Sequence, residues 1–362
     1  TMLSIMKGPY LLWPTQVSMT IMWETSCEAS SRVTYYKTEK VHSGLDGKFR
    51  TLTESEKIVE DQAFRKIHAI TLADLEPDST YHYRVNSVSG QGKTIESEEH
   101  FLKTSVKRNT PFSFTVTSET GGYGDHEINR ILFAEIKRYR PEFLLLVGDS
   151  VKRGSIYEEW DRWLFNPGKD LFTNTPFYLC LGNHEENSPW FYKFTTYPQP
   201  QNYYSFDYGN AHFVALDSPS GIHIKEGKSS LTDRGTGFTP GSPQYRFLVD
   251  DLAKTQATWK FVFFHHPPYV SADHQTEETQ ILCPIFEEYG VDIVFNSHTI
   301  IYERSHPITK GRVDLKSGVI YIVAGGAGAA PEWLHHKRSW HTAHGVAVPH
   351  FVQIAIAEGL LE

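Results

Sequence analysis

Long apolar segments are missing from this sequence of 362 residues. It contains no apolar run of about 18 residues, the length that a membrane-spanning helix needs. A basic excess is missing too: the formal net charge is −8, and a chain without a basic field is not an expected partner of nucleic acid. The first residues, TMLSIMKGPYLLW, lack the apolar region and cleavage site of a signal peptide. We therefore expect a soluble protein that binds neither membranes nor nucleic acids, cytoplasmic as the chain stands and secreted if a leader was removed.

Cysteine is scarce, with Cys27, Cys180 and Cys283 in unrelated segments. An odd, widely spaced set indicates neither a disulfide framework nor a thiolate metal site. The nucleophile elbow, the Walker A loop and the dinucleotide-binding glycine fingerprint are absent as well. Any phosphate chemistry must therefore come from another kind of local site.

Apolar residues are plentiful. Hydrophobic residues make up 40% of the chain and aromatic residues 14%, which at this length is enough material for two globular domains. Residues 7–105 read as short strands: VSMTIMWET and HAITL alternate apolar and polar residues, and LEPDSTYHYRV places a turn before another alternating run. We predict an all-β domain over residues 7–105.

Residues 110–358 show a different pattern. Short apolar runs bounded by turn residues recur there, in FSFTV, FLLLVGD, FYLCLGNHE, HFVALD, KFVFFHH, VDIVFNSH and VIYIVAGG. Amphipathic helical patterns lie between several of them, in HEINRILFAEIKRYR, PQYRFLVDDLAKT and ETQILCPIFEEYG. Buried strands that alternate with helices predict an α/β domain with an at least partly parallel sheet over residues 110–358.

Polar side chains that bind metals recur at the ends of these apolar runs. They are Asp149, Asn183, His184, His265, His266 and His298. A single residue of this kind is usually a hydrogen-bonded core or capping group. Ligands gather, however, at the carboxyl ends of strands in α/β domains. Several runs that end this way predict a site of nitrogen and oxygen donors, which suits Zn, Mn or Fe.

Four motifs carry a resemblance to a known family: GD at 148–149, GNHE at 182–185, HHPPY at 265–269 and SHTIIYER at 297–304. In their order and spacing the chain resembles the calcineurin-like metallophosphoesterase superfamily and, within it, the purple acid phosphatases. Its first domain resembles a fibronectin type III domain in the pattern of Trp23, Leu75, Pro77, Tyr81 and Tyr83. The resemblance implies a fibronectin type III-like β-sandwich followed by an α/β metallophosphoesterase domain, a sandwich of β-sheets flanked by helices.

The resemblance also implies roles for single residues. Family members hold two metals that share one aspartate and clamp the phosphate between them. Asp149 matches the shared aspartate, and Asn183, His265 and His298 match the other ligands of the second metal. His184 matches a residue that contacts the phosphate. Half of the metal centre is therefore complete in this sequence.

The ligands that belong to the first metal alone are all altered. The family's aspartate is replaced by Glu119 in Ser118-Glu119-Thr120, its tyrosine by Lys152, and the second histidine of its GHxH motif by Ile300. An ammonium does not ligate a cation at neutral pH, and isoleucine has no donor atom. We therefore predict one divalent transition metal, with no complete ligand set for a second. Lys152 is either a surrogate for the lost cation, neutralising Glu119 and Asp149, or a solvated loop lysine.

Three further histidines are candidates by position. His274 lies nine residues after His265, close to where the family holds the histidine that protonates the leaving group, and it is our general-acid candidate. His223 and His341 are candidate substrate-binding residues. His341 lies in PEWLHHKRSWHTAHG, a segment that a solvated aromatic loop explains equally well.

We predict a metal-dependent phosphoesterase, an acid phosphatase-like hydrolase that acts on phosphate mono- or diesters through a reduced, single-metal site. Its partners are then small phosphorylated or anionic substrates. Two alternatives stay open. One is a weakly active or inactive metal-binding pseudoenzyme, and the other is a non-hydrolytic metalloenzyme on the same fold. The sequence leaves the substrate and the oligomeric state open.

Overall fold

The computed structural model describes residues 2–42, 49–121, 126–220, 237–272, 274 and 276–362. The chain divides into two compact units, one of residues 1–107 and 169–177 and the other of residues 108–168 and 178–362. None of the helices among the described residues is long and apolar enough to cross a membrane. His223, one of the predicted substrate-binding residues, lies outside the described residues.

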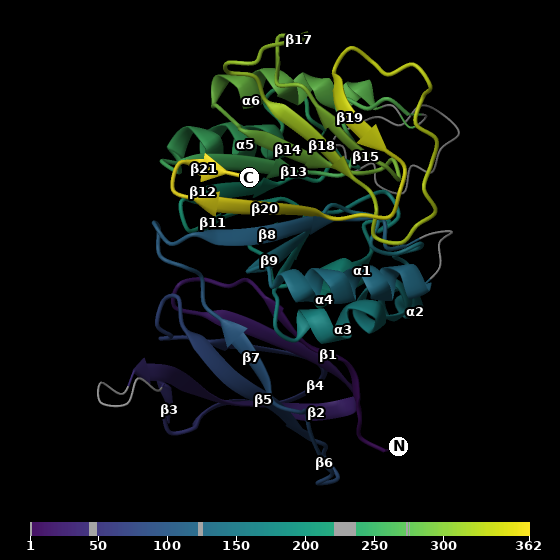
Figure 1. The fold of residues 1–362 in the computed structure, drawn as a ribbon. Helices are drawn as coiled ribbons and strands as arrows, with labels where there is room; N and C mark the ends of the chain where they lie inside the picture. The colour runs from purple at the N-terminus through teal and green to yellow at the C-terminus, as the bar shows by residue number, and fades with distance from the viewer. Residues whose placement is uncertain (1, 43–48, 122–125, 221–236, 273, 275) are drawn as a thin grey trace. The chain divides into compact units, whose positions relative to one another are not determined.

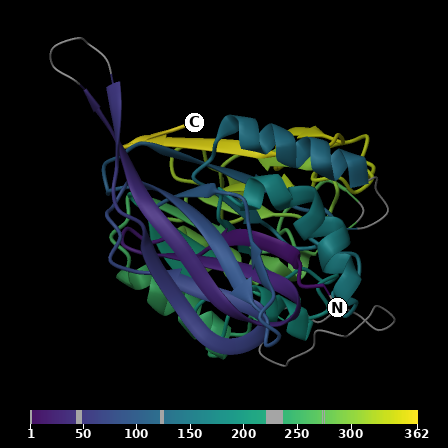
Figure 2. The same cartoon turned by 90° about the horizontal axis from the view of Figure 1, so that it is seen from below.

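The first unit is an antiparallel β structure. Its strands are β1 (Ile5–Leu12), β2 (Met19–His42), β3 (Phe49–Thr53), β4 (Lys57–Leu72), β5 (Thr80–Val88), β6 (Thr94–Glu96) and β7 (His100–Lys103). β2 pairs with β1, β3, β4 and β5, and its length is visible in Figure 2. Its pairing with β4 shifts register between Glu24 and Ala29 and again before Ser31. Irregularities of this kind let one strand pass from one layer of a sandwich to the other.

The core of this unit explains its aromatic pattern. Trp23 is fully buried, stacks on His68 with ring centroids 4.8 Å apart, and donates from Nε1 to Ser87 Oγ at 2.9 Å. Tyr81 and Tyr83 are buried in the same cluster. The predicted β-sandwich is confirmed, and its aromatic residues form the core.

Most strands of the second unit belong to two sheets. The smaller sheet runs in the order β10 (Phe177–Leu179), β9 (Phe143–Leu146), β8 (Phe112–Thr117), β20 (Val352–Ala357) and β21 (Leu360–Leu361). The larger runs in the order β11 (Tyr204–Tyr208), β12 (Ala211–Ala215), β13 (Trp259–Phe263), β14 (Ile293–Asn296), β18 (Ile320–Ala324), β15 (Tyr302–Ser305) and β19 (Thr342–Val346). A short hairpin joins β16 (Ile308–Thr309) to β17 (Arg312–Val313). β8 and β9 are parallel, and so are β12, β13, β14 and β18 in succession, which confirms the predicted partly parallel α/β domain.

Aromatic side chains join the two sheets. Phe114 of β8 packs edge-on against Phe213 of β12 and Phe261 of β13, with ring centroids 5.1 and 5.4 Å apart. Phe143 of β9 meets Phe213 in the same way at 5.3 Å. Edge-to-face pairs of this kind are favourable beyond the area that they bury. The sheets therefore share one apolar core, the sandwich of sheets that the resemblance implies.

Helices accompany the two sheets within the second unit. They are α1 (His126–Tyr139), α2 (Tyr157–Trp160), the π-helical η1 (Asp161–Phe165), α4 (Pro189–Phe194), α5 (Pro243–Lys254), the 3₁₀ helix η2 (Glu277–Leu282) and α6 (Cys283–Glu288). A further helix, α3 (Asn166–Phe172), runs across the boundary between the two units. Figure 1 shows α5 and α6 on the side of the larger sheet and α1 on the side of the smaller one. Leu248 of α5 and Phe286 of α6 pack into one cluster with Val262 and Val294 of the larger sheet.

The local sequence explains where two of these helices begin. The Ser242 hydroxyl accepts from the backbone N–H of Tyr245, and Pro243 occupies the first turn of α5, a favourable start for a helix. The segment ETQILCPIFEEYG, predicted as one helix, instead divides into η2 and α6. Pro284 lies at the start of α6, and because proline has no N–H, a continuous α-helix through this point would lack a hydrogen bond.

The carboxyl ends of the strands position the polar residues. β8 leads to Glu119, β9 to Asp149, β10 to Asn183, β13 to His265 and β14 to His298. The parallel strands of one sheet end at the same edge, so loops that follow different strands meet there.

Candidate metal centre

The four predicted ligands of one metal meet around the imidazole of His265. Its Nε2 atom lies 3.0 Å from Asp149 Oδ2, 3.2 Å from Asn183 Oδ1 and 3.2 Å from His298 Nδ1. The four residues come from four separate strand ends. Two imidazole nitrogens, a carboxylate oxygen and an amide oxygen are a donor set that Zn, Mn and Fe accept.

The orientation of His265 is set by its other ring nitrogen. Nδ1 lies 2.9 Å from the backbone carbonyl oxygen of Val147. A carbonyl oxygen only accepts, so Nδ1 carries the proton in this contact, and Nε2 is turned toward the other donors. Metal-binding histidines usually make such an outer hydrogen bond. Burial lowers the pKa of His265, but the charge of Asp149 outweighs burial and raises it to about 9 in the metal-free protein.

The backbone at the centre adopts an unusual conformation. Glu119, Asp149 and His298 have φ angles of 62°, 50° and 67°, in the left-handed region that residues with a side chain seldom enter. A Cβ atom at Gly148 would lie 2.7 Å from Nδ1 of His265, and one at Gly182 would collide with Asp149 Oδ1. Backbone strain of this kind collects at functional sites, and the glycines of GD and GNHE allow the loops to approach this closely.

Glu185 of GNHE, to which the sequence assigned no role, connects two of these loops. Its buried carboxylate accepts from the backbone N–H groups of Asp149 at 2.9 Å, Gly182 at 2.6 Å and Ser150 at 2.7 Å. Burial and the neighbouring charge of Asp149 raise the pKa of Glu185. Its position directly after two ligand-type residues was the only signal in the sequence, and that position does not reveal its partners.

The carboxylate of Glu119 is held by residues of another motif. Its Oε1 atom accepts from Ser297 Oγ at 2.6 Å and from the backbone N–H of His298 at 2.9 Å, and lies 4.0 Å from His265 Nε2. Burial and the charge of Asp149 raise the pKa of Glu119. By the resemblance in the sequence, Glu119 and Ser297 are both expected departures from the family motifs, and the structure brings these two residues into contact.

Lys152 and Ile300, at the other altered positions, are half-buried. The backbone carbonyl of Lys152 accepts from His184 Nδ1 at 2.7 Å. The backbone N–H of Ile300 donates to Glu332 Oε2 at 3.2 Å, while its side chain offers no ligand atom. Both residues therefore hold neighbouring side chains through their backbone.

His184 and His274, the two candidate catalytic residues, flank the ligands. His184 Nε2 lies 3.9 Å from Asp149 Oδ2, and its side chain is 44% exposed, so a substrate can reach it. The ring centroid of His274 lies 5.3 Å from that of His298, and its Nε2 atom is 3.1 Å from Glu332 Oε1. Glu332, which the sequence did not single out, therefore orients His274.

His266 adds a donor next to the predicted ligands. Its ring centroid lies 4.4 Å from that of His298, and with His265 these residues form one group of metal-competent nitrogens. Its Nδ1 atom is 2.8 Å from Ser218 Oγ, which also accepts from the His266 backbone N–H. Burial holds the pKa of His266 well below its usual value, so the imidazole is neutral.

His341, the second candidate substrate-binding residue, belongs to a different cluster. Its ring centroid lies 5.4 Å from that of Tyr269 and 5.5 Å from that of Trp340. The imidazole is buried, and its Nδ1 atom lies 3.7 Å from Glu303 Oε1. The structure places it on a cavity that adjoins the loop after β13.

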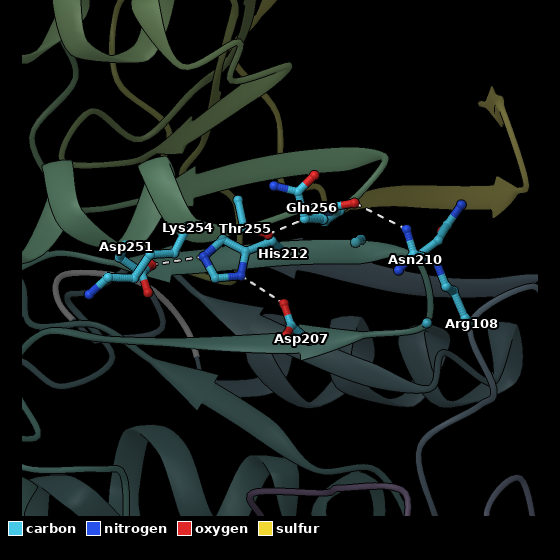
Figure 3. A pocket seen from close by; sticks show the side chains of 11 residues that line it. Arg108, Asp207, Asn210, His212, Asp251, Lys254, Thr255 and Gln256 are labelled. Carbon is cyan, nitrogen blue, oxygen red and sulfur yellow. Dashed lines mark hydrogen bonds and ion pairs between the residues drawn. The ribbon is translucent and has the colours of Figure 1, made fainter.

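A second charged cluster surrounds His212 of β12. Figure 3 shows the imidazole between Asp207 and Asp251, at 2.7 Å from Asp207 Oδ1 and 2.8 Å from Asp251 Oδ2. These residues line a cavity of about 410 Å³ where β12 and β13 begin, at the opposite strand ends from the metal ligands. Burial lowers the pKa of His212, but the two aspartates raise it to about 9.

The family model for calcineurin-like phosphoesterases matches residues 112–302, more than half of the chain. The chain belongs to the calcineurin-like phosphoesterase family. A model for the N-terminal domain of purple acid phosphatases matches residues 7–104. The resemblance and the fold class predicted from the sequence are thereby confirmed.

Curated relatives and solved structures agree with this family. Purple acid phosphatase 18 of Arabidopsis thaliana is 27% identical over 352 residues, which cover 87% of this chain and 72% of that protein. Acid phosphatase type 7 of Mus musculus is 25% identical, with 86% and 75% covered. Purple acid phosphatase 1 of Ipomoea batatas is 27% identical, and the match spans 59% of its length. The structure of purple acid phosphatase PPD1 from yellow lupin (Lupinus luteus) has a TM-score of 0.76 at 18% identity and covers 97% of this chain and 70% of its own.

Membership of the calcineurin-like phosphoesterase family supports metal-dependent hydrolysis of small phosphoesters, by an enzyme that uses transition metals such as Fe, Zn or Mn. The residues present fit such a metal. The donors around His265 Nε2 are nitrogen and oxygen atoms. Because Nδ1 carries the proton that is donated to Val147, Nε2 is the ring nitrogen that can ligate a metal.

Proposed function

We propose that this phosphoesterase works with one tightly held transition metal, bound by Asp149, Asn183, His265 and His298. The convergence of these donors carries the proposal, since the other three all lie within 3.2 Å of His265 Nε2. The metal would be Zn, Mn or Fe, for which this donor set is suited.

The other half of the family's two-metal site is reduced. Glu119 Oε1 accepts from Ser297 Oγ and from the backbone N–H of His298, so the carboxylate shares its lone pairs with these donors. The side chain of Ile300 offers no donor atom. The missing donor at Ile300 supports a centre in which the second cation is lost or weakly bound.

When bound, the metal supplies Lewis-acid polarisation of the phosphoryl group. His184, exposed beside Asp149, binds a phosphate oxygen. His274 donates a proton to the leaving oxygen, and Glu332, 3.1 Å from its Nε2 atom, stabilises the imidazolium. Because a single cation neutralises less charge than a pair, we expect phosphate diesters or monoesters with good leaving groups as substrates.

We propose that the ammonium of Lys152 takes over the charge of the missing cation. The buried carboxylates of Glu119 and Asp149 lie close enough to form one metal-competent group with His265. Burial and the charge of Asp149 raise the pKa of Glu119, because two close carboxylates resist being ionised together. Lys152 replaces a metal ligand in the family pattern, and its backbone contacts His184 within this site.

We further propose that residues 7–105 and 110–358 are the structural domains, and that His223 and His341 contact the substrate outside the metal centre. His341 supports this assignment because it lines a cavity next to the loop that carries His265.

The second candidate function is a metal-binding pseudoenzyme. Glu119, Lys152 and Ile300 favour it, because they replace residues that the family uses as ligands of the first metal. Fold alone does not decide between the two functions. A Plasmodium protein described as the anchor in the inner membrane complex shares this fold with a TM-score of 0.52 at 14% identity.

Metal analysis and activity together test the proposed function. Protein purified without chelator is expected to contain about one transition metal per chain and to hydrolyse a chromogenic phosphate ester. His298→Ala should lose both metal and activity. His306→Ala, its matched control, should keep both, because His306 lies beyond the motif at the end of β15. Metal without hydrolysis would favour the pseudoenzyme, and equal metal content in the two variants would contradict the ligand assignment.

A further inference from the structure

A cavity of about 380 Å³ adjoins the loop after β13. Its walls are formed mainly by residues 267–270, 276–280 and 339–341. Pro267 comes two residues after His265, and Thr276 comes two residues after His274. Two of the three walls therefore begin beside the proposed metal centre. The volume is in the range of pockets that bind small molecules.

The walls of this cavity are braced against each other. Thr276 Oγ1 donates to the carbonyl oxygen of Pro267 at 2.9 Å, and Gln280 Nε2 donates to that of Pro268 at 2.8 Å. These bonds hold η2 and the residue before it to the loop that follows His265. A cavity held open in this way needs little ordering when a ligand binds.

The lining favours an uncharged planar group. The rings of Tyr269, Trp340 and His341 contact one another, with centroids between 5.4 and 6.0 Å apart. The indole of Trp340 is 53% exposed, so part of its surface is available for stacking. Lysine and arginine are absent from the lining that the structure describes, and Glu277 is its charged residue. An additional phosphate would therefore be repelled here.

One buried polar atom of the lining makes no hydrogen bond to a described residue, although it lies 3.7 Å from Glu303 Oε1. His341 is 6% exposed, and its Nδ1 atom makes no hydrogen bond within the described part of the chain. Burial lowers the pKa of His341, so the neutral ring presents one donor and one acceptor.

We propose that this cavity binds the base of a nucleoside monophosphate, with the base against Trp340 and the phosphate at the metal centre. The inference rests on the proposed phosphoesterase function. Hydrolysis would break the bond between phosphorus and the nucleoside oxygen. Water supplies the hydroxyl that joins phosphorus and the proton that the nucleoside oxygen receives, so that nucleoside and inorganic phosphate are released. A sugar phosphate would leave the aromatic rings uncovered.

The test compares Trp340→Ala with Trp333→Ala. Trp333 belongs to the same segment but is 84% exposed and is not part of the cavity lining, so its removal is a matched control. Two substrates are used with the metal-loaded protein: adenosine monophosphate, and glycerol phosphate, which has no ring. Adenosine, which carries no phosphate, is measured as a ligand by calorimetry.

Trp340→Ala is expected to raise KM for adenosine monophosphate and the Kd for adenosine about tenfold, and to leave hydrolysis of glycerol phosphate unchanged. Trp340→Phe should restore most of the affinity, and Trp333→Ala should match the parent. Equal losses with both substrates, or an unchanged Kd for adenosine, would overturn the proposal. If the parent hydrolyses neither ester, the proposed function fails, and adenosine binding still decides whether the cavity recognises a base.

Discussion

At the scale of single residues, Glu185 positions the proposed metal ligands without being a ligand itself. Its carboxylate accepts three backbone N–H groups, from Asp149, Ser150 and Gly182. These contacts fix the strained turn at Asp149, whose φ is 50°. The residue therefore acts on the proposed metal through the ligand that it positions.

Glu185→Gln is expected to lower metal affinity by about 10- to 100-fold, because the amide group turns a donor toward backbone donors. It should also lower the free energy of unfolding by about 1 to 3 kcal/mol. Metal titration and denaturant unfolding measure the two effects. Glu186→Gln is the control, because Glu186 accepts from the Ser155 N–H away from the ligands. Parent-like metal affinity in Glu185→Gln would refute the positioning role.

A separate prediction concerns the contribution of Lys152 to stability. If its ammonium offsets the charges of Glu119 and Asp149, Lys152→Met leaves two close carboxylates without that charge. We expect the free energy of unfolding to fall by about 1 to 3 kcal/mol, less than for a fully buried pair because Lys152 is half-buried. Lys316→Met, at an exposed position, is the control in the same denaturation experiment. Equal stability of the two variants would reject the surrogate-cation role.

Restoring the family pattern tests the half of the centre that we propose is reduced. The triple variant Glu119→Asp, Lys152→Tyr and Ile300→His introduces the three ligand types that the resemblance assigns to the first metal. It is expected to raise the metal content from about one to about two per chain and to increase phosphatase activity. Elemental analysis of the purified variant measures the stoichiometry. A content that stays at the parent value would show that other contacts, such as that of Ser297 with Glu119, also exclude the metal.

At the scale of secondary-structure elements, His212 links three of them. Asp207 belongs to β11, His212 to β12 and Asp251 to α5, and Ser205 of β11 also donates to Asp251 at 2.8 Å. α5 covers the larger sheet, so this cluster joins its last turns to the edge of the sheet. The ion pairs exist only while the imidazole carries its proton.

The stability of this linkage is expected to depend on pH. The pKa of His212 is raised from 6.5 to about 9, so its contribution is complete below the unfolded value and is lost as pH rises through about 9. We expect a loss on the order of 2 kcal/mol, discounted because the Asp207 side chain is 75% exposed. Unfolding of the metal-loaded parent and of His212→Gln, compared at about pH 6 and about pH 10, measures it. A parent and variant that lose stability in parallel would contradict this assignment.

At the scale of the whole molecule, the proposed metal lies entirely in the second unit. Its ligands follow β9, β10, β13 and β14, all of which lead into residues 149–298. The first unit has a separate core around Trp23. Metal binding should therefore stabilise the second unit and leave the core of the first unaffected.

Metal removal tests this separation. A metal that binds only the folded state stabilises it by about 2.7 kcal/mol when its free concentration is about a hundred times its Kd. Chelation is expected to reduce hydrogen-exchange protection in β9, β13 and β14, with protection in β2 and β5 unchanged. Peptide-resolved exchange by mass spectrometry measures both regions. Loss of protection in β2 and β5 as well would show that the first unit depends on the metal.

Local patterns in the sequence determined the strands that carry the site. The apolar runs FLLLVGD, KFVFFHH and VDIVFNSH became β9, β13 and β14, because a buried parallel strand needs apolar residues on both faces. The helices at 126–139 and 243–254 followed from their apolar periodicity. The short strands β15 and β19, near the edge of the larger sheet, were not predicted, because they carry no comparable apolar run.

The tertiary structure alone decided which residues meet at the centre. Ser297 and Glu119 are 178 positions apart, and Glu185 acts through backbone groups that no side-chain pattern identifies. The His212 cluster and the cavity beside Trp340 likewise join segments from different elements. Motifs predict which atoms are able to bind a metal, because ligand chemistry belongs to the residue type. Distances, burial and protonation belong to the folded chain, because they depend on residues that only packing brings together.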